Sequence, residues 1–182
     1  ERWVLGLQSG ISFWHGDFAR AATMAERSLE LAVTRSGVMR ATSMRARALA
    51  RLGDIEGLHS VINASEDSSF DNRSDEENGM ILFSETNHLR CIGTANLWAG
   101  ESQKAQEQLT RALQSYLAEV PANFATIATI RADIAMSFLN QRDVEGASEA
   151  LTPLLEVEPD LRLEGAMRRM RSLRTVLDAP AF

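Results

Sequence analysis

A tight-turn signal that recurs along the chain constrains the fold more than any other feature. It reads Gly-Asp at 16–17 and 53–54, Gly-Glu at 100–101, and Arg-Asp at 142–143. Successive turns are 37, 47 and 42 residues apart, and apolar or small residues recur at helical spacing on both sides of each turn. A glycine followed by an acid suits the end of one helix and the N-cap of the next. The pattern therefore predicts four antiparallel helical hairpins.

The clearest hairpin covers residues 89–116. Gly93 precedes its turn and Ala105 follows it, so both can lie where the two helices touch. One such hairpin cannot bury its apolar face alone and must stack on similar hairpins. We therefore predict an all-α, tetratricopeptide-like helical-hairpin solenoid of about four hairpins plus a C-terminal capping helix, forming one domain over residues 1–182. An irregular helical bundle with ordinary Gly-Asp connections is the alternative.

The apolar periodicity between the turns sets the expected helix bounds. In the first two hairpins the helices are expected at about 1–15, 18–34, 39–51 and 55–64. In the last hairpin Pro153 should kink or shorten the second helix. A final helix is expected from about Leu161, where a stripe of Leu and Met residues predicts a cap that ends the stack.

Most of the formal charge of −6 lies in one segment. Residues 66–77 hold six acids and one base, so this segment alone carries −5 and the rest of the chain is close to neutral. The stretch 65–78 has too few apolar groups to offset the entropy of ordering, and it is predicted to be a mobile loop. It could bind a divalent cation, but it lacks the Asp-x-Asp-x-Asp-Gly order of a calcium loop, which favours a solvated linker.

Nothing in the sequence nominates a catalytic residue, a metal site or a cofactor. His15, His59 and His88 are far apart and in no metal-ligand spacing, so one is expected in a loop and two on helix surfaces. The single cysteine, Cys91, has no evident activating base and fits a reducing compartment. No apolar run approaches the roughly 20 residues needed to cross a bilayer. We therefore expect a cytoplasmic protein that is neither an enzyme nor membrane-bound.

The first helix of each hairpin should line the concave surface of such a stack. Arg40 and Arg47 lie two turns apart on one helix face, and Arg90 on the next hairpin can join them in a cationic wall. The predicted groove residues are Arg40, Ser43, Arg47, Asn87, Arg90, Thr94, Leu97 and Met136. Such a groove suits a peptide, a protein segment or an acidic amphipathic small molecule. Solvated arginines on an unoccupied surface are the alternative.

The stretch 162–174 holds five arginines and one acid, Glu164. Such a run could contact phosphates, as in nucleic-acid-binding proteins. However, it also carries a full apolar stripe and no aromatic side chain on which a base could stack. We therefore expect a solvated face of the capping helix and no specific DNA binding by residues 1–182.

A set of small and apolar residues, concentrated after Gly79, carries a family resemblance. The residues are Phe83-Ser84, Gly93-Thr94, Ala112-Leu113, Asp133-Ile134-Ala135, Asp143, Gly146-Ala147, Ala150-Leu151, Leu154-Leu155 and Leu173. This set resembles the C-terminal regions of actinobacterial helix-turn-helix transcriptional regulators of the XRE type. In such proteins an N-terminal DNA-binding domain is joined to tetratricopeptide-like hairpins. The basic residues fit a GC-rich actinobacterium, because all but one of the 19 are arginine.

The resemblance implies a regulatory domain that senses a ligand or peptide, or that dimerises. A homodimer is expected, and DNA would be contacted only through an N-terminal domain that this chain lacks, so the chain is expected to be a fragment. The sequence departs from the pattern in having no helix-turn-helix domain and in having Arg142 where the other turns have glycine. The alternative function is a stand-alone tetratricopeptide-type adaptor for protein–protein interaction.

Overall fold

The computed structural model describes residues 1–67, 82–119, 123–157 and 164–178, and these ranges consist of α-helices and their connections. The predicted all-α class is confirmed for this part of the chain. Most of the predicted mobile loop, residues 68–78, lies outside the described residues. Within the described ranges, none of the helices is long and apolar enough to cross a lipid bilayer.

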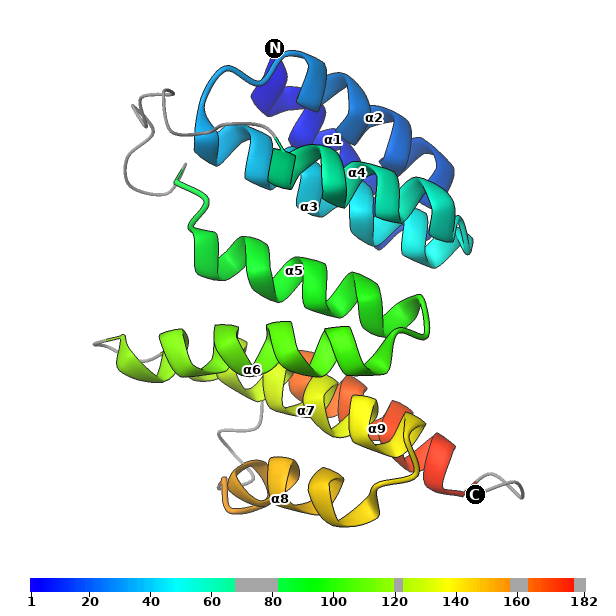
Figure 1. Cartoon of the computed structure of the whole chain (residues 1–182), viewed down its shortest axis with the longest axis vertical. Helices are drawn as coiled ribbons and strands as arrows, with labels where there is room; N and C mark the ends of the chain where they lie inside the picture. The colour runs from blue at the N-terminus through cyan, green and yellow to red at the C-terminus, as the bar shows by residue number, and fades with distance from the viewer. Residues whose placement is uncertain (68–81, 120–122, 158–163, 179–182) are drawn as a thin grey trace.

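Four helix pairs follow one another along the long axis, and the last helix of the chain lies beside the fourth pair (Figure 1). In chain order the helices are α1 (Arg2–Trp14), α2 (Phe18–Glu30), α3 (Arg35–Leu52), α4 (Ile55–Asp67), α5 (Glu85–Trp98), α6 (Ser102–Ala118), α7 (Phe124–Asn140), α8 (Val144–Leu155) and α9 (Glu164–Leu177). The pairs are α1–α2, α3–α4, α5–α6 and α7–α8, and the first helices also contact one another in the series α1, α3, α5, α7. We call the surface carried by these four helices the first-helix face.

All four predicted turns end their first helix in the same way. Gly16, Gly53 and Gly100 have φ of 81°, 76° and 83°, and Arg142 has φ of 62°. This left-handed conformation normally requires glycine. The amide after each of these residues donates to the carbonyl five residues earlier, at 2.9–3.0 Å. The four turns predicted from the sequence are therefore confirmed, including the one that lacks glycine.

The acid that follows the turn caps the next helix in three hairpins. The capping carboxylates belong to Asp17, Asp54 and Asp143, and each accepts from the amide three residues on, at 3.1, 2.9 and 2.8 Å. Glu101 is longer and makes no such cap bond. Its carboxylate instead lies 2.7 Å from His59 Nε2 on α4 and 2.7 Å from Lys104 Nζ. The third turn is therefore tied to the preceding hairpin, not only to its own helix.

The expected close contact inside the third hairpin is present. A Cβ atom on Gly93 would lie 2.8 Å from Leu109 Cγ, closer than side chains tolerate. Ala105 and Leu109 are completely buried in the same apolar cluster. Glycine at position 93 is therefore what lets α5 and α6 approach this closely.

Two predicted helix bounds are wrong at the junction of the first two hairpins. α2 was expected to reach Thr34 but ends at Glu30, and α3 begins at Arg35, four residues earlier than expected. The reason is a cap: the Thr34 hydroxyl accepts from Gly37 N at 3.0 Å, which starts a new helix there. α8 ends two residues after Pro153, in line with the predicted shortening.

The last helix does not simply extend the row of hairpins. α9 packs along α7 (Figure 1), and Leu173 is buried in a cluster with Ala135 and Leu139 of α7. α9 therefore lies beside the last hairpin, along its first helix, and its role as a cap stays a prediction.

Candidate functional site

Arginines and aromatic rings lie together where α1, α2, α3 and α5 meet, next to the first-helix face. Phe13 of α1 and Trp98 of α5 are nearly parallel, with ring centroids 5.9 Å apart and an angle of 18°. The Arg47 guanidinium carbon on α3 lies 4.5 Å from the Phe13 centroid and 5.6 Å from the Trp98 centroid. One turn further along α3, Arg51 lies 5.0 Å from the Phe18 centroid and 5.4 Å from that of Trp98. Cation–π contacts of this kind hold both guanidinium groups in place.

Arg47 is a half-buried cation without an acidic partner. Burial lowers the pKa of Arg47, and the nearby positive charges of Arg90 and Arg169 lower it further. The guanidinium stays protonated at neutral pH, because even a lowered arginine pKa remains far above 7. Within the described ranges no carboxylate forms an ion pair with Arg47. Its direct contacts are therefore ring faces, while Cys91 and Asp133 act on its charge only from a distance and partly oppose the lowering of its pKa.

Arg90 on α5 is also half-buried without an acidic partner among the described residues. Its Nε and Nη2 atoms donate to Asn87 Oδ1 at 3.1 and 2.7 Å, and Nη2 lies 3.4 Å from Cys91 Sγ. Burial raises the pKa of Tyr116 on α6, and the neighbouring Arg90 opposes this rise. The hydrogen-bond partners of Arg90 are thus neutral groups. Burial lowers the pKa of Arg90, but Cys91, Tyr116 and Asp133 outweigh this effect, so that its pKa is raised overall.

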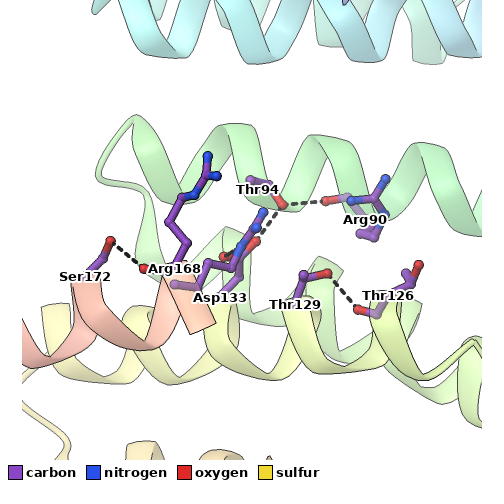
Figure 2. A network of polar contacts seen from close by, with 8 residues as sticks. Arg90, Thr94, Thr126, Thr129, Asp133, Arg168 and Ser172 are labelled. Carbon is purple, nitrogen blue, oxygen red and sulfur yellow. Dashed lines mark hydrogen bonds and ion pairs between the residues drawn. The ribbon is translucent and has the colours of Figure 1, made fainter. Parts of the chain in front are cut away.

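Among the described residues, the acid that acts on both Arg47 and Arg90 is Asp133, and it is already ion-paired. Asp133 of α7 is buried, and its carboxylate accepts from Thr94 Oγ1 of α5 at 2.9 Å and from Arg169 Nε of α9 at 2.6 Å. Figure 2 shows Thr94 and Asp133 meeting between α5 and α7, with Arg168 projecting from α9 beside them. Because Arg169 balances Asp133, Arg47 and Arg90 give this region a local excess of positive charge.

The predicted groove residues do not all gather in one place. Arg47 and Arg90 are near enough to influence each other electrostatically, and Asn87 and Thr94 belong to the same polar region. Arg40 lies elsewhere, with its guanidinium carbon 5.7 Å from the Phe83 centroid, and it lines a small hollow with Arg2 and Trp3. Of the three arginines predicted to lie together, Arg47 and Arg90 are close to each other, and Arg40 lies at a separate position.

Three other predicted groove residues serve the packing between helices. Ser43 is buried, and its hydroxyl lies 2.8 Å from His88 Nδ1. Leu97 is buried in the apolar cluster of α5, α6 and α7, and Met136 is half-buried against that cluster. Ser43 is thus already in contact with His88, and Leu97 and Met136 already pack against other side chains of the same chain.

The expectation for His88 is wrong. It was placed on a helix surface, but it is half-buried between α3 and α5, with Nδ1 also 3.1 Å from the Met39 carbonyl oxygen. Burial lowers its pKa below the ordinary value of 6.5. Arg169 was likewise assigned to a solvated face, whereas it pairs with a buried carboxylate. Sequence periodicity misplaces both, because each bonds to a residue of another hairpin.

Sequence reasoning missed the roles of three residues in this region. The sequence pattern gives Trp98 no role, although it stacks on Phe13. Asp133 offered a signal, because an acid between the apolar residues Ile130 and Ile134 must find a partner when it is buried. Its partner Arg169 lies 36 residues away, and no local spacing links the two.

The chemistry open to this region is the binding of an anion. Two fixed guanidinium groups can each donate to a carboxylate, and the adjacent rings offer an apolar surface. Among the described residues, no three His, Cys, Asp or Glu side chains gather into a group that could hold a metal ion. In comparisons with known proteins, no protein-family model matches the sequence, and no curated protein matches it.

Proposed function

We propose that this chain is the ligand-sensing regulatory domain of a bacterial transcriptional regulator, built as a tetratricopeptide-like solenoid. A ligand that carries a carboxylate binds on the first-helix face, between Arg47 of α3 and Arg90 of α5. The observation that carries this proposal is the presence of two half-buried arginines without an acidic partner among the described residues. Four similar hairpin turns and the serial contact of the first helices support the solenoid.

The ligand class follows from the chemistry of the two arginines. A carboxylate between them would relieve their mutual repulsion and gain charge-assisted hydrogen bonds, each of about 1.5–3 kcal/mol. The stacked rings of Phe13 and Trp98 lie beside Arg47, so they would receive an apolar or aromatic group on the same ligand. A peptide carboxylate next to a hydrophobic side chain, or a small amphipathic acid, has both parts.

Sensing follows from the position of the two arginines on different hairpins. A ligand held by both would favour the spacing of α3 and α5 that lets both arginines reach it. The ligand could shift the equilibrium between this arrangement and another one only by as much as its affinity differs between the two. The assignment to a transcriptional regulator is supported by the sequence resemblance, and DNA binding would belong to a helix-turn-helix domain outside this sequence.

Calorimetry with a defined probe tests the ligand site. N-acetylphenylalanine supplies one carboxylate and one ring. N-acetylphenylalanine amide, in which a neutral carboxamide replaces the carboxylate, is the uncharged control probe. We expect Arg47→Gln and Arg90→Gln each to weaken probe binding by about tenfold or more, which corresponds to roughly 1.4 kcal/mol. Arg111→Gln on α6 is the matched control, because Arg111 is exposed and lies outside the region. Equal affinity of all three variants, or equal binding of the amide, would remove the proposed site.

Native mass spectrometry of the protein from its own host tests the ligand class. We expect a co-purified acid whose retention depends on Arg47. A regulator further predicts that the intact protein protects a specific DNA site while residues 1–182 alone do not. If the intact protein binds no DNA but retains peptide segments of other proteins, the adaptor function is correct.

A further inference from the structure

The outer side of α1 is apolar along its whole length and faces solvent. The residues are Trp3, Val4, Leu7, Ile11 and Trp14, with 47, 53, 47, 60 and 72% of their surface exposed. Their spacing places them on one side of the helix, which we call the α1 stripe. The opposite side, with Leu5, Ser9 and Ser12, is buried against the rest of the chain.

The α1 stripe is large for an uncovered surface. Two tryptophans and three aliphatic side chains, each about half exposed or more, leave on the order of 500 Å² of apolar surface in contact with water. The largest apolar patch of a typical monomer is about 300–600 Å² and is often functional. Other exposed apolar side chains, such as Val33 and Phe124, lie on other elements. The stripe is therefore the strongest candidate for an interaction surface in the described part of the chain.

A glycine beside the stripe indicates that another helix approaches it. Gly6 and Gly10 both lie inside α1, where a glycine costs about 0.5–1 kcal/mol relative to alanine. A Cβ atom on Gly6 would meet Ser28 Oγ at 3.8 Å and Met44 Sδ at 3.9 Å, whereas one on Gly10 would meet nothing within 4 Å. No contact among the described residues therefore uses the small size of Gly10, but a helix crossing α1 from outside would.

The charge of α1 favours a second copy of the same helix. From Trp3 to Trp14 the sequence holds no charged side chain. Two α1 stripes can therefore face each other without like-charge repulsion, whereas nothing on this surface attracts a charged partner. Two copies would cover about 1,000 Å² from the stripe alone, which reaches the area that a specific interface needs.

We propose that two copies of the chain form a dimer through their α1 stripes. The two-fold axis lies perpendicular to the two helices and makes them antiparallel, so Trp3 of one copy faces Trp14 of the other and Leu7 faces Ile11. The axis passes near the middle of the stripe, and Gly10 lies close to it, where the two backbones approach most closely. The stripe contains neither Arg47 nor Arg90, although the ring of Trp14 lies edge-on against that of Phe13, with centroids 5.9 Å apart. The dimer is tested at Leu7 and Ile11, so either proposal can fail without the other.

Sedimentation velocity and tryptophan emission test the dimer. At up to about 100 μM, where a specific interface of this area is occupied, we expect a dimer whose emission shifts to the blue with increasing concentration. Leu7→Glu and Ile11→Arg should each give a folded monomer. Leu117→Glu on α6 is the matched control, because Leu117 is as exposed as Leu7 at 47%, and it should leave the dimer intact.

Mixing the two charged variants tests the antiparallel register. In the proposed dimer the new glutamate at position 7 faces the new arginine at position 11 of the other copy. An equimolar mixture of Leu7→Glu and Ile11→Arg chains should therefore recover dimers that neither variant forms alone. A parent chain that stays monomeric, a dimer that survives Leu7→Glu, association into larger aggregates, or a mixture that stays monomeric would each overturn the proposal.

Discussion

Arg142 has a backbone conformation that the other three hairpin turns give to glycine. Its φ is 62°, and the left-handed region costs a residue with a side chain about 1–2 kcal/mol. Glycine adopts this conformation without strain, but it loses more conformational entropy on folding than arginine does. This entropy loss offsets part of the stability gained by removing the strain. The fourth turn therefore forms because its helices pack and Asp143 caps α8, not because the turn residue favours it.

Replacing Arg142 should therefore stabilise the chain. We expect Arg142→Gly to raise the free energy of unfolding by about 0.5–1 kcal/mol, measured by urea denaturation. The matched reverse change is Gly100→Arg, which places a side chain at φ of 83° with open space around its Cβ position and should lower stability by a similar amount. No change in either variant would mean that backbone strain at this position is negligible.

At the scale of elements, α9 is joined to the stack by a buried charge pair and an apolar contact. Arg169 bonds to Asp133 inside the polar region between α5 and α7, and Leu173 fills the cluster beside it. Removing one partner of a largely buried pair leaves the other charge without compensation, which costs more than the pair contributes. The docking of α9 therefore depends on one arginine among several on the same helix.

The prediction that follows compares two arginines on α9. Arg169→Met should lower the free energy of unfolding by about 1–3 kcal/mol, because the buried Asp133 carboxylate loses its ion-pair partner. Arg171→Met is the control: its pair with Glu164 is exposed and should change stability by less than about 0.5 kcal/mol. Adding Asp133→Asn to the Arg169→Met variant should recover part of the loss. Equal effects of the two arginine changes would contradict a special role for Arg169.

Elements within a hairpin were predictable from the sequence, whereas contacts between hairpins were not. A helix end needs a left-handed residue and a cap, so the turns at Gly16, Gly53 and Gly100 are visible in the sequence. Thr34 was missed because a capping threonine also fits the end of an apolar pattern. The contacts of Ser43 with His88 and of Asp133 with Arg169 depend on how far one hairpin rotates against the next, which local periodicity does not encode.

At the scale of the molecule, the junction between the second and third hairpins differs from its neighbours. α2 packs on α3 and α6 packs on α7, but the corresponding contact between α4 and α5 is minor. A cleft of about 250 Å³ lies among α3, α4, α5 and α6. Polar contacts bridge it, including Ser43 with His88, and Arg35 with Glu85 at 3.2 Å. The molecule is therefore expected to open first at this junction.

Acid should weaken this junction through His88. Burial lowers the pKa of His88, while the Met39 carbonyl oxygen and Glu85 oppose the shift and Arg35 adds to it. Above its ordinary pKa of 6.5, His88 is neutral in both the folded and the unfolded chain, and stability is complete. As the pH falls below that value, His88 binds a proton in the unfolded chain more readily than in the folded chain. The free energy of unfolding therefore decreases with falling pH, until the pH reaches the lowered pKa of His88 in the folded chain.

The measurement is thermal unfolding between about pH 8 and pH 5, above the range in which most carboxylates titrate. We expect the melting temperature to fall toward pH 5, and His88→Gln to reduce this dependence. His15→Gln changes an exposed histidine at the end of α1 and should leave the slope as it is. Amide exchange at pH 5 should rise first in α5, where it faces α3. A slope that survives His88→Gln would place the pH sensitivity elsewhere.

The two ends of the molecule differ in a way that limits how many copies can join. The α1 end presents a continuous apolar stripe, whereas α9 lies along α7 at the other end, and the exposed apolar side chains there are scattered: Val144, Leu155 and Leu177. A head-to-tail contact would need both ends and would propagate into a filament. A contact between the α1 stripes of two copies covers both stripes at once. Association then stops at two copies, so a higher protein concentration increases the fraction of dimer without producing longer assemblies.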